Sequence, residues 1–177
     1  MRKIATLICL CLVLGCGNGQ KEIDSAYRLA KSIESSIEIG ITRYELRKKL
    51  QELNTATSIV NEKAASESEI NKLKKLKEVV SIYKDSLVLW ENLDSRELRG
   101  CFQVINKSLY NVHIKDGGAF DPSSIHTEDQ NTKAKQIYDI INRHQNLIIE
   151  TTQSKLGNWW VISKNSHQKL WGMAAIN

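Results

Sequence analysis

The chain has 177 residues, a formal net charge of +5, 6% aromatic residues and one proline, Pro122. So little proline, together with many Lys, Glu, Leu, Ile and Ser residues, favours helices and argues against a turn-rich β-sandwich. The positive charge is small and dispersed, so we expect no nucleic-acid partner.

The N-terminus has the pattern of an export signal. Arg2 and Lys3 precede an apolar run from Ile4 to Leu14 that is broken only by Thr6. A run of about eleven residues is too short for a membrane span, which needs about 20 apolar residues. It fits the central region of a secretory signal instead.

The end of this run, Val13-Leu14-Gly15-Cys16, resembles the lipobox of bacterial lipoproteins. The resemblance implies that the Cys16 thiol receives a diacylglyceryl group and that a signal peptidase cuts before Cys16. Residues 1–15 would then be the signal peptide and residues 16–22 a lipidated tether to the membrane. A plain signal peptide, or an uncleaved apolar start, is the alternative interpretation.

The lipobox also implies a location in the bacterial cell envelope. Gly17 follows the cysteine, where an Asp would indicate retention in the inner membrane. In a Gram-negative cell, the periplasmic face of the outer membrane is therefore expected. Removal of Arg2 and Lys3 with the signal would leave a net charge of about +3.

Cysteine usage excludes an intrachain disulfide in the mature chain. Cys9 and Cys11 leave with the signal and Cys16 carries the lipid, so Cys101 alone remains. We interpret Cys101 as a buried small apolar residue rather than a nucleophile.

Three stretches have the apolar spacing of amphipathic helices joined by short turns. Gly40 ends the first, Thr42 and Glu45 form a predicted capping box for the second, and Ser66 with Glu69, or Ser68 alone, caps the third. The predicted apolar stripes are Ile23, Ala26/Tyr27, Ala30, Ile33 and Ile37; Leu46, Leu50, Leu53, Thr57 and Val60; and Ile70, Leu73, Leu76, Val80, Tyr83, Leu87 and Trp90.

The second half of the chain is less regular. A weaker helical pattern runs over 95–112, and the turn signals Asp116-Gly117-Gly118 and Asp121-Pro122 mark an irregular loop near 115–131. Thr132 is the predicted cap of a further helix, which Gly157 ends. We therefore predict an all-α fold, an antiparallel bundle of about four to five helices, as a single domain over 23–177.

Two groups of residues are candidates for surface contact. Four lysines, on the polar side of the third helix, make a solvated face or meet anionic lipid or cell-wall polymer. Three C-terminal tryptophans pack in the core, or form a membrane-interface belt or a partner site. The candidates are Lys72, Lys74, Lys75 and Lys77, and Trp159, Trp160 and Trp171.

Nothing in the sequence indicates catalysis, a metal or a cofactor. His113 and His126 flank a loop that carries Asp116, Asp121, Glu128 and Asp129, but the ligand spacing of a zinc site or an EF-hand is missing. No phosphate loop, nucleophile elbow or zinc-protease motif is present. We expect no catalytic residues, no metal ligands and no cofactor.

Two functions from different classes remain. The first is a non-catalytic, lipid-anchored envelope protein that acts through contact with an envelope protein partner, in a structural, adaptor or toxin-protective role. The alternative is an envelope lipoprotein that binds a small ligand or a cell-wall fragment. A pocket lined by the C-terminal tryptophans would favour the alternative.

Overall fold

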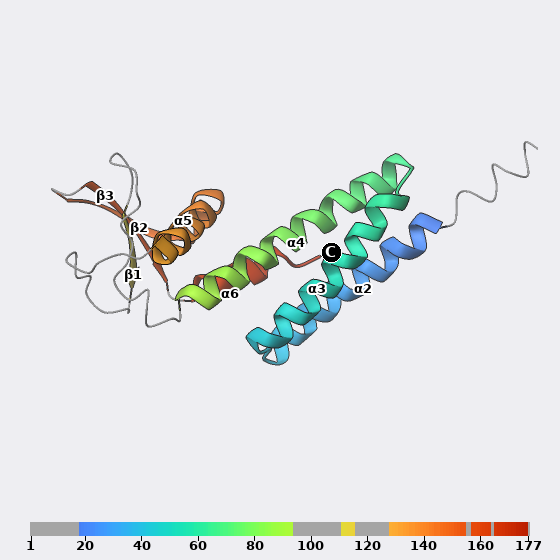
Figure 1. Cartoon of the computed structure of the whole chain (residues 1–177), viewed down its shortest axis with the longest axis horizontal. Helices are drawn as coiled ribbons and strands as arrows, with labels where there is room; N and C mark the ends of the chain where they lie inside the picture. Colours follow the sequence, from blue (N-terminus) through green and yellow to red (C-terminus); the bar gives the residue numbers. More distant parts are fainter. Residues whose placement is uncertain (1–17, 94–110, 116–127, 155–156, 164, 177) are drawn as a thin grey trace, which may run out of the picture. The chain divides into compact units, whose positions relative to one another are not determined.

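The computed structural model describes residues 18–93, 111–115, 128–154, 157–163 and 165–176. Helices dominate this part of the chain, which confirms the predicted all-α helical bundle, and a small sheet is added to it (Figure 1). The elements are the helices α2 (Asn18–Ile39), α3 (Arg43–Lys63), α4 (Glu67–Leu93), α5 (Glu128–Arg143) and α6 (Ser166–Met173), the 3-10 turn η2 (Gln145–Leu147), and the strands β1 (Asn111–Lys115), β2 (Ile148–Ser154) and β3 (Gly157–Ser163).

The described residues fall into two compact units. Unit 1 holds α2, α3, the part of α4 up to Ser81 and the segment that begins at Ala174. Unit 2 runs from Ile82 to Met173. The single domain over 23–177 stays a prediction.

Unit 1 is an antiparallel three-helix arrangement whose core comes from one apolar face of each helix. Every residue of the predicted stripe on α3 is buried, whereas Ile70 of the predicted α4 stripe is 52% exposed, so its assignment to the core is wrong. The buried side chains are Ile23, Ala26, Ala30 and Ile33 on α2; Leu46, Leu50, Leu53, Thr57 and Val60 on α3; and Leu73, Leu76, Val79 and Val80 on α4.

Short, well-capped turns fix this arrangement. Gly40 has a φ of 106°, in the left-handed region that favours glycine, and its N–H donates to Ser36 O at 3.1 Å. The predicted Thr42–Glu45 capping box is confirmed. At the start of α4, Ser66 N donates to Glu69 Oε2 at 2.9 Å and Glu69 N donates to Ser66 Oγ at 3.3 Å. The second predicted cap is therefore confirmed in its Ser66–Glu69 form.

α2 begins at Asn18, so residues 18–22 are helical although the sequence indicated a tether there. Gln20 Nε2 donates to Asp24 Oδ1 at 2.6 Å, one turn along the helix. Gly19 is buried, and a Cβ at this position would collide with the Glu69 carboxylate. The first turn of α2 thus packs closely on the start of α4, which stabilises a helix that periodicity alone did not reveal.

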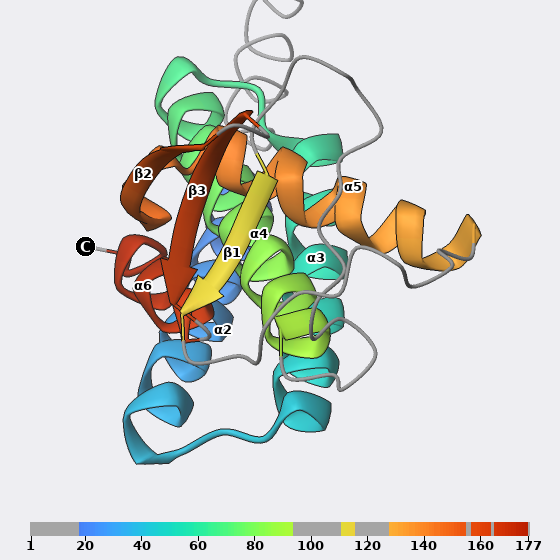
Figure 2. The same ribbon diagram turned by 90° about the vertical axis from the view of Figure 1, so that its left-hand side faces the viewer.

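Unit 2 contains a three-stranded sheet that the sequence did not predict. The strand order is β1-β3-β2, with β1 parallel to β3 and β2 antiparallel to it (Figure 2). Trp160 of β3 is paired with Val112 on one side and with Thr151 on the other. The sheet overturns the predicted helix from Thr132 to Gly157, because α5 ends at Arg143 and the chain continues as η2 and β2.

The boundaries of the irregular loop also change. Lys115 belongs to β1, and α5 begins at Glu128, before the predicted cap at Thr132. The other residues of the predicted loop, 116–127, lie outside the described residues. In the predicted 95–112 helix, Asn111 and Val112 are in a strand and the rest lies outside the described residues. Cys16, Cys101 and His126 also lie outside them.

Candidate functional site

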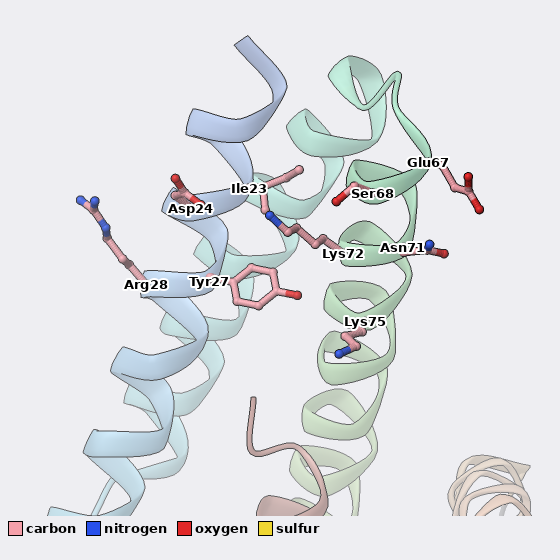
Figure 3. A pocket seen from close by; sticks show the side chains of 9 residues that line it. All are labelled: Ile23, Asp24, Tyr27, Arg28, Glu67, Ser68, Asn71, Lys72 and Lys75. Atoms are coloured by element: carbon pink, nitrogen blue, oxygen red, sulfur yellow. The ribbon is translucent and has the colours of Figure 1, made fainter. Parts of the chain in front are cut away.

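A groove runs between α2 and the first turns of α4 in unit 1 (Figure 3). Its volume is about 860 Å³, within the range of about 300–1,000 Å³ for ligand sites. The lining residues are Ile23, Asp24, Tyr27 and Arg28 from α2 and Glu67, Ser68, Asn71, Lys72 and Lys75 from α4.

The side chains that enter the groove are of two kinds. Tyr27 reaches from α2 toward α4, and Lys72 reaches from α4 toward α2, with Lys75 one turn below it (Figure 3). Ile23 supplies a buried apolar floor, and the Ser68 hydroxyl also faces the gap. The groove therefore combines the ammonium group of the half-buried Lys72 and that of the exposed Lys75 with two hydroxyls and a small apolar surface.

The remaining charged side chains lie on the outside. Asp24 and Arg28 leave α2 on the side away from α4, and Glu67 leaves α4 on the side away from α2 (Figure 3). Both carboxylates thus stand at the rim of the groove, while the two lysines supply its inner charge.

A chain of exposed hydrogen bonds links α4 to α2 beside the groove. Lys72 Nζ donates to Gln20 Oε1 at 3.0 Å, and Gln20 Nε2 donates to Asp24 Oδ1 at 2.6 Å. The half-buried Tyr27 lies below this chain, and burial raises the pKa of its hydroxyl above the ordinary value of 10.0. Tyr27 is therefore neutral at physiological pH and can donate a hydrogen bond into the groove.

The predicted lysine cluster is divided by the structure. Lys72 and Lys75 line the groove. Lys77 instead donates to Asn61 Oδ1 of α3 at 2.6 Å, and Lys74 is exposed. Because α4 turns by 100° per residue, neighbouring lysines of one basic run serve different surfaces.

The acidic residues near the groove mouth are held by other groups. Hydrogen bonds from Ser66 N and Ala65 N lower the pKa of Glu69 below 4.5. A hydrogen bond and ion pair with Lys63, at 2.7 Å, lower the pKa of Glu22. Glu69 caps α4, and Glu22 of α2 pairs with Lys63 of α3. Neither carboxylate belongs to the lining of the groove.

Unit 2 has its own buried polar cluster, in which Asp85 of α4 meets the end of α5. Asp85 Oδ1 accepts from Arg143 Nη2 at 2.7 Å, and Asp85 Oδ2 lies 2.8 Å from His144 Nε2. The hydrogen bond to Asp85 raises the pKa of Arg143 above its ordinary value. Both acceptor oxygens of Asp85 are thereby used, which is the pattern of a structural ion pair.

The tryptophans of unit 2 take part in aromatic packing. Trp160 is 6% exposed and stacks on Tyr138 at 5.4 Å between ring centroids. Trp171 is half-buried and meets Trp90 edge-on at 5.3 Å, and its Nε1 donates to Ser86 Oγ at 3.2 Å. The pocket described above is thus not lined by these tryptophans.

Trp159 belongs to β3, but its side chain lies outside the described part of the structure, as does that of His113 in β1. Surface contact through the C-terminal tryptophans stays a prediction. Sequence reasoning missed the groove and Asp85. An aspartate within the mostly apolar stretch 79–89 was the available signal for Asp85.

Two features are absent from the part of the chain that the structure describes. None of the helices there has the length and apolar character needed to cross a bilayer. No three His, Cys, Asp or Glu side chains among the same residues gather in a way that could hold a metal ion.

Comparisons of the chain with protein-family models, with curated proteins and with solved structures find no match.

Proposed function

We propose that this chain is a non-catalytic bacterial lipoprotein, anchored in the cell envelope through Cys16, that acts through contact with a partner protein. The anchor rests on the lipobox-like sequence that ends at Cys16. Because α2 begins at Asn18, Gly17 alone separates the lipid-bearing residue from a folded helix. Unit 1 would then be held at the membrane surface.

The observation that carries the contact function is the turn between α2 and α3. Ile39 is 88% exposed and Tyr44 is 76% exposed, and they are the two most exposed large hydrophobic residues in the described part of the chain. Single exposed apolar residues are ordinary on protein surfaces, but two in one short turn indicate a contact surface. We refer to residues 39–44 as the distal turn.

The position of the distal turn suits a partner away from the membrane. α2 has 22 residues, which gives a length of about 33 Å at about 1.5 Å per residue. The distal turn therefore stands one full helix length from the proposed lipid attachment. Gly40 and the Thr42–Glu45 capping box fix its backbone, so binding would cost little ordering of the turn.

The chemistry of the distal turn indicates the kind of partner. Arg43, Arg47 and Lys48 are exposed at the start of α3, next to Tyr44. A protein with an apolar pocket for an isoleucine or tyrosine side chain and carboxylates at its rim would fit this surface.

Site-specific crosslinking in the source bacterium tests the contact. A photoreactive phenylalanine analogue at position 44 should give discrete protein adducts after illumination. The same analogue at Glu52, an exposed position further along α3, is the matched control. Absence of adducts from position 44, or the same adducts from both positions, would contradict a contact through the distal turn.

The groove in unit 1 favours a second candidate, an envelope lipoprotein that binds a small ligand or a cell-wall fragment. Its volume and convergent polar groups support this function. A soluble ligand that stabilises the purified chain, with no effect of changes at Ile39 or Tyr44 in cells, would favour it over the first.

A further inference from the structure

The groove has the chemical features of an anion site. Lys72 and Lys75 place two ammonium groups between α2 and α4, and Tyr27 and Ser68 add two hydroxyl donors (Figure 3). Lysine binds phosphate as a compact point charge, and hydroxyls complete its hydrogen bonds.

The helix directions add to this preference. α2 and α4 are both antiparallel to α3, so their N-termini lie at the same end of unit 1 (Figure 3). Each helix N-terminus carries a partial positive charge of roughly half a unit. The first turn of α4 already carries Glu67 and Glu69, whereas the first turn of α2 carries no acidic residue. The α2 end therefore adds to the charge of Lys72 and Lys75 and favours one negatively charged group in the upper part of the groove.

The rim limits the kind of anion. Asp24 and Glu67 stand at the outer edges of the groove, and Arg28 beside Asp24 offsets only one of these two charges. The rim therefore carries one net negative charge and does not attract a large polyanion. A single phosphate group on a partly apolar molecule would instead enter between the lysines and rest on Ile23 and the Tyr27 ring.

The position of the groove identifies the source of such a molecule. Its lining residues on α2 are 23, 24, 27 and 28, which lie within about 15 Å of Asn18 along the helix axis. If Cys16 is lipidated, this end of unit 1 lies next to the headgroups. This step, but not the groove chemistry, rests on the anchoring proposed above.

We propose that the groove between α2 and α4 binds the phosphate group of an anionic phospholipid, with Lys72 and Lys75 as the charged contacts and Tyr27 and Ser68 as hydroxyl donors. The bound headgroup would orient unit 1 on the membrane, with the distal turn directed away from it. The site would thus add a second attachment to the lipid at Cys16.

Lipid retention in native mass spectrometry tests this site. The full chain, purified in uncharged detergent micelles, is incubated with an equimolar mixture of phosphatidylglycerol and phosphatidylcholine. We expect one phosphatidylglycerol to be retained. The variant Lys72→Gln/Lys75→Gln should weaken its binding about tenfold or more, since each lysine near an anionic surface contributes to affinity.

The control is Lys74→Gln/Lys77→Gln, which removes the same charge from the same helix outside the groove. It should change binding less than about threefold, with helix content by circular dichroism as the check on folding for both. Tyr27→Phe keeps all charges and should weaken binding by a few-fold through loss of one donor. Because micelles replace the bilayer, the result does not depend on whether Cys16 carries lipid.

Three outcomes would overturn the proposal. Equal weakening by both double variants would indicate diffuse charge attraction only. Unchanged binding in Lys72→Gln/Lys75→Gln would exclude the groove. Complete displacement of phosphatidylglycerol by an equal concentration of glycerol phosphate would show that the site takes a soluble phosphate rather than a lipid headgroup.

Discussion

Asp85 and Arg143 are 58 positions apart in the sequence and form a two-point ion pair in unit 2. Arg143 Nη2 lies 2.7 Å and Nε 3.3 Å from the two Asp85 carboxylate oxygens. The Asp85 side chain is 11% exposed, whereas that of Arg143 is 53% exposed. The burial is thus one-sided, and the two partners should respond differently to substitution.

We expect Asp85→Ala to lower the free energy of unfolding by roughly 1–3 kcal/mol, because it removes the carboxylate that Arg143 and the mostly buried His144 ring contact. Arg143→Gln should cost less, since a half-exposed guanidinium is partly screened by water. All four tryptophans fall within the range of unit 2, so urea unfolding followed by tryptophan fluorescence reports on this unit.

The matched control is Asp139→Asn, which breaks an exposed pair with Lys135 on the same helix and should cost less than about 0.5 kcal/mol. If Asp85→Ala cost no more than this control, the ion pair would not stabilise unit 2.

Gly19→Ala should destabilise unit 1 although alanine is the better helix former. The added Cβ would collide with the Glu69 carboxylate, which the cap at Ser66 holds in place. Overpacking of this kind costs about 1–3 kcal/mol.

Gly172→Ala is the counterpart, because nothing lies within 4 Å of the new Cβ. It should be neutral or stabilising by up to about 1 kcal/mol. Thermal unfolding followed by circular dichroism compares both with the parent, and an unchanged or raised midpoint for Gly19→Ala would refute the close packing of α2 on α4.

Leu76→Ala should lower the free energy of unfolding by roughly 2–5 kcal/mol, because Leu76 is fully buried in unit 1. Ile70→Ala on the same helix should cost less than about 0.5 kcal/mol, since Ile70 is half-exposed. Urea unfolding followed by helix content gives the free energy of unfolding of both variants. Similar losses in the two variants would show that the core face of α4 is wrongly assigned.

The capping carboxylates make unit 1 sensitive to acid. The pKa values of Glu69 and Glu45 are lowered below 4.5, chiefly by backbone hydrogen bonds from Ser66 and Thr42. A lowered folded-state pKa gives a stabilisation that is complete above 4.5 and is lost as the pH falls through the folded value.

Glu69→Gln keeps an acceptor for the cap but cannot titrate, so its unfolding midpoint should fall less than the parent's between about pH 6 and about pH 3. Glu67→Gln changes a carboxylate outside the capping box, so the unfolding midpoint of this variant should fall with pH as that of the parent does. Parallel curves for the parent and Glu69→Gln would contradict the role of Glu69.

Unit 1 was largely predictable because local signals specify it. The periodic stripe of α3, the cap residues Thr42 and Ser66, and Gly40 each act within a few residues, and the structure contains all of these features. The start of α2 was not predictable, since Asn18 and Gly19 are poor helix formers and their helix depends on contact with α4.

Unit 2 was harder because its strands depend on pairing between distant segments. Ile148 continues the helical spacing of α5, but it pairs with Ile162 of β3 after a sharp turn at His144. A short apolar run fits a strand or a buried helix equally well by periodicity. The groove was not predictable either, since it joins α2 residues to α4 residues that lie 39 to 52 positions away in the sequence.

The most direct test of the proposed anchoring is metabolic labelling with a fatty-acid probe in a bacterium that expresses the chain. The parent chain and Cys11→Ser, which changes a cysteine inside the leader, should both be labelled and processed. Cys16→Ser should accumulate as an unlabelled, longer precursor. Normal labelling and processing of Cys16→Ser would contradict the assignment of this chain as a lipoprotein.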